Sequence, residues 1–190
     1  MRLLELFKGT GSIGEVVVSG KGAKSASFQY GKDPVIWLPA ASMTVAYEPG
    51  VFSGEDVSRV NLSLRPPQDI QDQLSRLDGF VVSFVAANRE RLLGKALTEE
   101  QALARYQPTL RISEKGYAPT MKCKMNVSGK NVCRVWQGKQ SREPPETWAG
   151  ATLSVRLWLN SLYIMGANFG CTIDVTDVSI NQEARRDCSF

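Results

Sequence analysis

The sequence predicts an α+β protein built on a strongly bent antiparallel sheet or a small β-barrel. Strand patterns occupy both ends of the chain, and a helical period interrupts them at about residues 67–104. The 190 residues are 43% hydrophobic and 22% charged, an ordinary composition for one folded domain. We therefore expect a single domain over residues 1–190, with a helical insertion at about 67–104 and a short C-terminal tail from about 181.

The first third of the chain is rich in glycine and β-branched residues. Glycines and prolines at positions such as Gly20, Gly31, Pro34 and Pro39 divide it into short segments. These segments have the composition of strands and are expected at 13–18, 27–30, 35–38, 43–47 and 57–64.

The period changes after Pro66-Pro67, where apolar residues recur at spacings of three and four. They are Ile70, Leu74, Leu77, Val81 and Phe84. This spacing predicts a helix with one apolar face, with Gly79 as a candidate break into two helices. The capping-box sequence from Thr98 to Gln101 begins a shorter helix that ends before Pro108.

The second half is dominated by strands. Segments 119–127 and 131–136 are expected to form a hairpin across Ser128-Gly129-Lys130. A polar loop over 137–150 follows, and then two long strands at 151–165 and 169–180.

The composition excludes several kinds of chemistry. The chain has no histidine, so imidazole bases, Ser-His or Cys-His nucleophiles and histidine-containing zinc sites are excluded. Its four cysteines include no CxxC pair, and we expect buried, reduced thiols. The composition therefore provides no histidine- or CxxC-based catalytic or metal site, and we expect no enzyme activity, no cofactor and no metal site.

The positive charge is concentrated in one segment. Residues 105–160 carry ten Lys and Arg against three Asp and Glu, whereas the whole chain has a net charge of only +4. Such a segment is typical either of a solvated surface or of a surface that binds a polyanion.

Strand alternation separates an apolar side from a basic, aromatic side in this segment. Tryptophan on the outer side of a sheet needs cover or a ligand, so either the helices of 68–104 cover this side or it binds single-stranded nucleic acid by base stacking. Tyr106 and Tyr117 are either further stacking positions or interior residues. The predicted nucleic-acid-binding residues are Lys122, Lys124, Arg134, Trp136, Arg156, Trp158 and Tyr117.

Three segments carry a resemblance to a known family: Tyr106–Leu110, Tyr117–Lys122 and, most closely, Leu157–Ile173. In the last, an aromatic-rich strand end is followed by Phe169-Gly170. Residues 106–180 thereby resemble single-stranded DNA-binding proteins of the podophage type, to which OB-fold proteins of large DNA viruses are related. The resemblance implies an OB-like barrel and sequence-tolerant binding of single-stranded DNA in replication or recombination, without catalysis.

Family members end in an acidic tail with a terminal aromatic residue that recruits replication proteins. In this chain Phe190 is terminal, but the charges of Glu183, Arg185, Arg186 and Asp187 cancel. Recruitment of replication proteins by this tail, homo-oligomer formation and the choice between DNA and RNA stay open. Neither a membrane-spanning stretch nor a signal peptide is recognisable, so we expect an intracellular protein at sites of DNA replication, in the nucleus or the cytoplasm.

Two alternatives belong to other functional classes. The turn Gly9-x-Gly11-x-x-Gly14 is similar to the first motif of DNA methyltransferases and would make the chain an S-adenosylmethionine-binding methyltransferase fragment. The residues after it, Glu15–Ser19, do not have the composition of the helix that this motif requires. The other alternative is a non-catalytic structural or partner-binding module whose basic sheet side is covered by its own helices.

Overall fold

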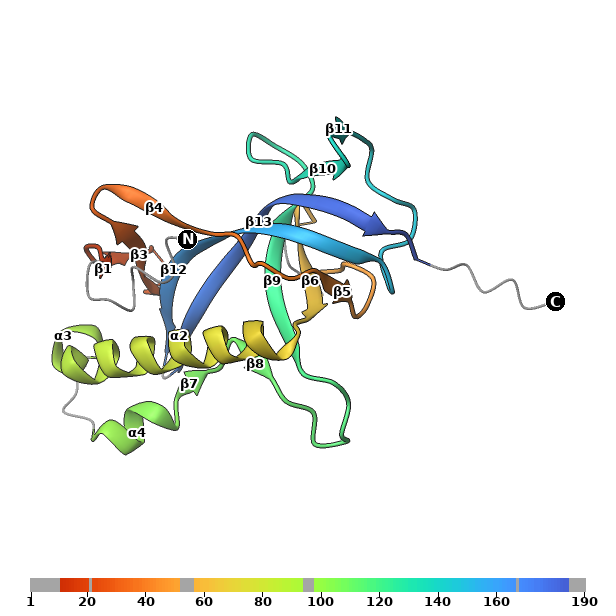
Figure 1. Ribbon diagram of the computed structural model, residues 1–190. Helices are drawn as coiled ribbons and strands as arrows, with labels where there is room; N and C mark the ends of the chain where they lie inside the picture. Colours follow the sequence, from red (N-terminus) through yellow and green to blue (C-terminus); the bar gives the residue numbers. More distant parts are fainter. Residues whose placement is uncertain (1–10, 21, 52–56, 94–97, 167, 185–190) are drawn as a thin grey trace. The chain divides into compact units, whose positions relative to one another are not determined.

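The computed structural model describes residues 11–20, 22–51, 57–93, 98–166 and 168–184 (Figure 1). These residues form mostly β-sheet with few helices, which confirms the α+β class. Contacts divide the chain into two compact units: unit 1 contains residues 1–37, 72–109 and 158–173, and unit 2 contains 38–71, 110–157 and 174–190. Two long, curved strands, β12 (Thr152–Met165) and β13 (Asn168–Gln182), contribute residues to both units. The single-domain organisation stays a prediction.

Unit 1 is organised around β3, to which β1, β2, β4 and the C-terminal part of β12 pair antiparallel. The start of β13 pairs in parallel with β7. The strands that lie wholly in unit 1 are β1 (Gly11–Ile13), β2 (Val17–Val18), β3 (Lys24–Tyr30), β4 (Asp33–Trp37) and β7 (Tyr106–Gln107). The expected strand at 13–18 is therefore two short strands, both paired to β3.

The helices are α2 (Gln68–Ala87), α3 (Arg89–Leu93) and α4 (Glu99–Leu103), and all but the first four residues of α2 belong to unit 1. Helix α2 runs without a break through Gly79, where a Cβ would meet open space. Val85 and Ala86 are buried near its end, whereas the predicted Phe84 is only half-buried. The capping box before α4 is confirmed, because the Thr98 and Gln101 side chains exchange hydrogen bonds with each other's backbone N–H.

Unit 2 is a mixed sheet, so the expectation of an antiparallel sheet is wrong in part. Strand β13 pairs in parallel with both β9 and β10, while β6 pairs antiparallel with β5 and β9. Strand β12 pairs antiparallel with β5, and β8 with β9. The strands that lie wholly in unit 2 are β5 (Met43–Val45), β6 (Arg59–Arg65), β8 (Leu110–Arg111), β9 (Thr120–Asn126), β10 (Arg134–Gln137) and β11 (Gln140–Ser141).

The predicted hairpin between 119–127 and 131–136 is wrong. Strands β9 and β10 lie on opposite sides of β13, and β10 forms its hairpin with β11. The two segments are linked at Asn126, whose O accepts a hydrogen bond from Cys133 N and whose Nδ2 donates one to Asn131 O, after which the chain continues to the far side of β13. A glycine turn signal is local, so it cannot reveal that a third strand separates the two segments.

The alternation of buried and exposed side chains along β13 shifts by one residue in unit 2. Val175 is buried, and the next buried positions are Val178 and Ile180, with Thr176 and Asp177 half-buried between them. An interruption of this kind is a β-bulge pattern, and it turns Asp177 to the side away from the core. This slip positions the candidate site.

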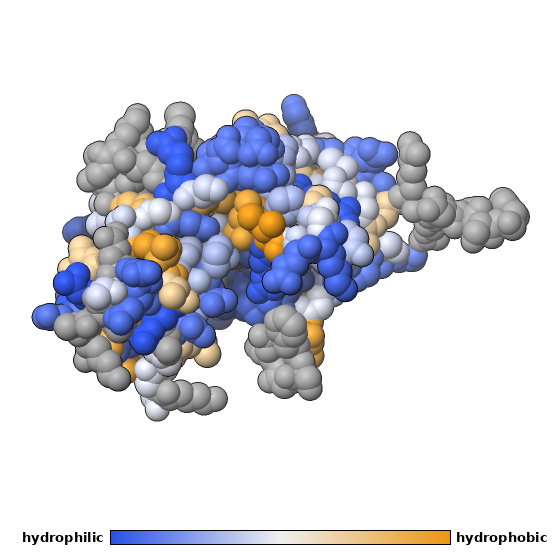
Figure 2. Space-filling model, turned by 90° about the horizontal axis from the view of Figure 1, so that it is seen from below, coloured by the Kyte–Doolittle hydropathy of each residue, from blue (hydrophilic) through white to orange (hydrophobic). Residues whose placement is uncertain are grey.

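The molecular surface in Figure 2 is mostly hydrophilic over the coloured residues, with hydrophobic side chains in a few small groups. Among the helices that the structure describes, none combines the length and the apolar character needed to cross a bilayer.

Candidate nucleic-acid interface

The polar side of unit 2 begins with strand β9. Met121, Cys123 and Met125 are buried, whereas Lys122 and Lys124 are half-buried on the opposite side. In the antiparallel register with β6, Lys122 lies opposite Ser63 and Lys124 lies opposite Asn61. The separation of an apolar and a lysine-bearing side, predicted from alternation, is confirmed for β9.

Three predicted site residues converge on one carboxylate that the sequence analysis did not single out. Arg134 Nε lies 2.7 Å from Asp177 Oδ1, and Trp136 Nε1 donates a hydrogen bond to the same oxygen at 3.3 Å. Arg156 Nη1 lies 3.8 Å from Asp177 Oδ2, which also accepts a hydrogen bond from Thr176 Oγ1 at 3.0 Å. We call Arg134, Trp136, Arg156, Thr176 and Asp177 the Asp177 cluster.

The Asp177 cluster keeps its cations exposed and its carboxylate covered. The side chains of Arg134 and Arg156 are 58% and 45% exposed, whereas that of Asp177 is 14% exposed. Burial raises the pKa of Asp177, but hydrogen bonds from Arg134, Thr176 and Trp136 outweigh it, and the pKa lies below its ordinary value. Asp177 is therefore ionised at neutral pH, and the two guanidinium groups outnumber it.

The Arg134 guanidinium also lies over the Trp136 ring, 6.0 Å from its centroid. This distance is within the range of a cation–π interaction. The arrangement combines an aromatic ring for stacking with two exposed cations for phosphates, which is the chemistry of a surface that binds single-stranded nucleic acid.

A second ion pair lies on the same side of unit 2. Arg59 of β6 binds the buried Asp174 of β13, and Asp174 lies opposite Lys124 in the parallel register. The sequence analysis missed Asp174 and Asp177 because it did not separate the two sides of this last strand. Alternation alone would have misplaced one of them, because the slip between Val175 and Val178 changes the side on which successive residues lie.

Two further predicted residues, Tyr117 and Trp158, are not members of the Asp177 cluster. Tyr117 is 67% exposed in the loop between β8 and β9. Trp158 belongs to unit 1 and is half-buried, and the described part of the chain offers its buried Nε1 no acceptor.

Tyr106 is an interior residue. It is buried in unit 1, its ring lies 5.3 Å from that of Phe169, and its hydroxyl donates a hydrogen bond to Asp78 of α2. Asp78 also accepts a hydrogen bond from Thr109 N. Tyr106 therefore packs the unit and offers no stacking surface.

The cysteines of the described residues are free thiols in covered positions. Cys123 and Cys133 are buried, and Cys171 is half-buried. Burial raises the pKa of all three thiols, that of Cys133 to about 12, so they are protonated at neutral pH. The expectation of buried thiols is confirmed for Cys123 and Cys133, whereas Cys171 is only half-buried.

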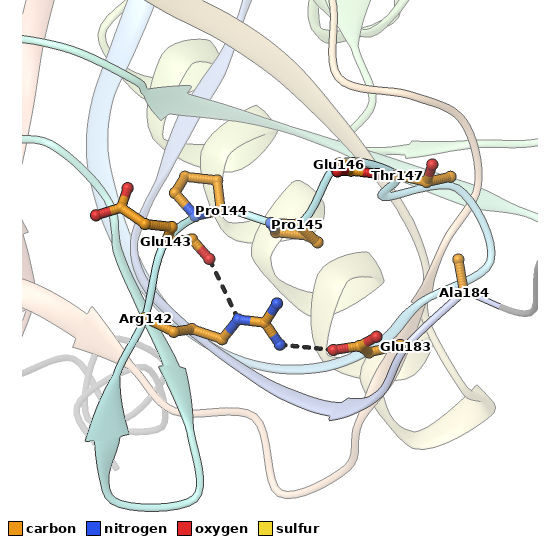
Figure 3. Close-up of a pocket in the computed structure, with 8 residues that line it drawn as sticks. All are labelled: Arg142, Glu143, Pro144, Pro145, Glu146, Thr147, Glu183 and Ala184. Atoms are coloured by element: carbon orange, nitrogen blue, oxygen red, sulfur yellow. Dashed lines mark hydrogen bonds and ion pairs between the residues drawn. The ribbon is translucent and has the colours of Figure 1, made fainter.

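Two other features of the described residues bear on alternative sites. Residues 9 and 10 of the glycine turn lie outside the description, Gly11–Ile13 is strand β1, and no helix follows before β2. A polar hollow in unit 2 is lined by residues 142–147, 183 and 184 (Figure 3). Across it, Arg142 Nη1 bonds Glu183 Oε1 at 2.6 Å, and Glu143 and Glu146 make its lining acidic and unsuited to phosphate.

The fold is similar to that of a solved bacteriophage single-stranded DNA-binding protein. The structure is similar to that of gp2.5, a single-stranded DNA-binding protein encoded by bacteriophage T7, with a TM-score of 0.53 and 16% sequence identity over 81% of this chain and 95% of that chain. The predicted resemblance is thereby confirmed for the fold.

A second solved structure gives a weaker match. It is the single-stranded DNA-binding protein from bacteriophage Enc34 in complex with single-stranded DNA, with a TM-score of 0.47, 12% identity, and coverage of 92% of this chain and 94% of that chain. No protein-family model and no curated protein matches the sequence.

Proposed function

We propose that this chain is a non-enzymatic protein that binds single-stranded DNA without sequence preference during DNA replication or recombination. The observation that carries the proposal is the Asp177 cluster, in which the exposed Arg134 lies over the Trp136 ring and the exposed Arg156 approaches the same carboxylate. The shared fold with the T7 protein supports it. Bases stack on the ring and phosphates bind the cations, so unpaired strands are preferred over duplex.

The proposed architecture is an OB-like barrel. The strand pairings support it, since β12, β5, β6, β9 and β13 pair in that order and β13 pairs again with β12. The proposed site residues are those predicted from the sequence: Lys122, Lys124, Arg134, Trp136, Arg156, Trp158 and Tyr117. The high exposure of Arg134 and Arg156 argues against a module whose basic side is covered by its own helices.

The decisive experiment measures binding of fluorescent oligo(dT) by anisotropy. Trp136→Ala should weaken binding by about 1 to 3 kcal/mol, similarly for oligonucleotides of different sequence. Tyr47→Ala is the matched control, because Tyr47 is an exposed aromatic residue of unit 2 outside the proposed site. Equal affinity of Trp136→Ala and the parent protein would remove Trp136 from the interface.

Salt dependence tests the cations separately. Arg134→Ala should lower the slope of log affinity against log salt by about 0.7, the value expected for one lost phosphate contact on a single strand. Lys32→Ala, which removes an exposed charge in the turn between β3 and β4 of unit 1, should leave the slope unchanged. A duplex of the same length should compete poorly; equal competition by duplex and single strand would contradict base stacking.

A further inference from the structure

The two carboxylate oxygens of Asp177 have different partners. Oδ1 is shared by Arg134 Nε and Trp136 Nε1, while Oδ2 is approached by Thr176 Oγ1 and Arg156 Nη1. The single hydroxyl proton of Thr176 lies between two acceptors, Asp177 Oδ2 at 3.0 Å and the β12 backbone oxygen Arg156 O at 3.3 Å. The carboxylate is therefore fixed from several directions and can fix its partners in turn.

A carboxylate beside a proposed polyanion site has two opposite possible effects. It can compete with phosphate for the arginines, or it can hold them in a conformation that phosphate recognises. The contact at Arg134 distinguishes the two, because Asp177 uses the Nε edge of the guanidinium. In the described part of the chain, no acid is recorded at its terminal nitrogens, and the Arg134 side chain is 58% exposed. The edge suited to a phosphate is left available.

Asp177 also restricts the Trp136 ring. The indole N–H is directed to Oδ1, and the Arg134 guanidinium lies 6.0 Å from the ring centroid. Side chains with many rotamers lose conformational entropy when they bind a ligand, and ordering them beforehand reduces that loss. One carboxylate thus orders both the stacking residue and its neighbouring cation.

We propose that Asp177 is a positioning residue for single-stranded DNA, which holds Arg134 and Trp136 in their binding conformation. This inference rests on the proposed function. Removal of a negative charge beside a polyanion site would ordinarily strengthen binding. Here we expect removal of the Asp177 carboxylate to weaken DNA binding when the hydrogen-bond acceptor is removed together with the charge.

The test compares Asp177→Ala with Asp177→Asn, which remove the same charge. Asparagine retains an oxygen that can accept from Arg134 Nε and Trp136 Nε1, whereas alanine does not. We expect Asp177→Ala to bind oligo(dT) about tenfold more weakly than Asp177→Asn, the effect of ordering two side chains. Equal affinities, or tighter binding by the alanine variant, would show that Asp177 only offsets charge and would overturn the proposal.

To distinguish loss of positioning from a general structural defect, Asp177→Ala and Asp177→Asn are compared again in a protein that also carries Arg134→Ala and Trp136→Ala. The difference between alanine and asparagine at position 177 should disappear there, because the side chains that it positions are gone. A difference that persists would assign the effect to the fold and overturn the proposal.

A readout without DNA distinguishes this inference from the proposed function. The Trp136 indole N–H resonance, assigned with Trp136→Phe, should move in Asp177→Ala and stay near its parent position in Asp177→Asn. If the parent fails to bind oligo(dT) while this pattern holds, the proposed function fails and the positioning of the indole stands. If the parent binds and neither variant moves the resonance, the positioning fails and the function stands.

Discussion

Asp177 and Asp78, both among the residues that the structure describes, each accept a hydrogen bond from an aromatic residue, and their surroundings differ. Asp177 in unit 2 receives the Trp136 indole together with two exposed arginines, and its pKa is lowered. Asp78 in unit 1 receives the Tyr106 hydroxyl and Thr109 N, and burial raises its pKa despite these bonds. The first arrangement presents charge to solvent, and the second joins α2 to β7 inside a unit.

This difference shows why an aromatic residue in a basic segment is weak evidence for binding. Tyr106 and Trp136 both lie in the segment of concentrated positive charge, residues 105–160. Only the structure shows that Tyr106 packs on Phe169, whereas Trp136 lies beside an exposed guanidinium. The useful criterion is the combination of a ring, an exposed cation and a carboxylate that orders them.

The largest expected effect concerns the interior of unit 1, where Tyr106 packs on Phe169. Phe169→Ala should lower the free energy of unfolding by about 3 to 5 kcal/mol, because Phe169 is fully buried against Tyr106. Urea denaturation followed by circular dichroism measures this loss. A loss below about 1 kcal/mol would mean that Phe169 does not pack the unit 1 core as described.

A matched pair of substitutions sharpens the contrast. Tyr106→Phe and Trp136→Phe each delete a donor to an aspartate and keep an aromatic ring. Tyr106→Phe should cost about 1 to 3 kcal/mol of unfolding free energy, because it leaves a partly buried carboxylate with one donor fewer, and should not change oligo(dT) affinity. Trp136→Phe should weaken oligo(dT) binding and change stability less. Urea titrations and anisotropy on both variants check this, and reduced affinity in Tyr106→Phe would contradict the assignment.

Much of the fold was predictable because local signals determine it. Strand alternation in β9 and the first part of β12 separated buried from polar residues correctly, and the capping box located α4. What was missed depends on partners far apart in the sequence. The parallel pairing of β10 with β13 and the slip before Val178 together bring Asp177 to Arg134 and Trp136. The pairing has no signal within either strand, and the slip shows in the sequence only as the spacing of three between Val175 and Val178. The basic and aromatic partners were predictable, but the carboxylate that organises them was not.

The smallest expected effect is a difference in pH dependence between the two aspartates. A group with a raised folded pKa, such as Asp78, contributes stability that is fully present below its unfolded pKa and is lost as the pH rises through the folded pKa. Lowering the pH from about 7 to about 4 should therefore stabilise the parent relative to Asp78→Asn.

Asp177 should show the opposite sign. Burial raises its pKa, but hydrogen bonds from Arg134, Thr176 and Trp136 lower the pKa by more than burial raises it. Its folded pKa therefore lies below the unfolded value. Its stabilising contribution is present above the unfolded pKa and is lost as the pH falls through the folded pKa. The parent should therefore lose stability relative to Asp177→Asn below about pH 4. Urea titrations of the parent and both variants across this range measure the two trends. Trends of the same sign would show that the arginines do not control the ionisation of Asp177, and the distinction between the two carboxylates would fail.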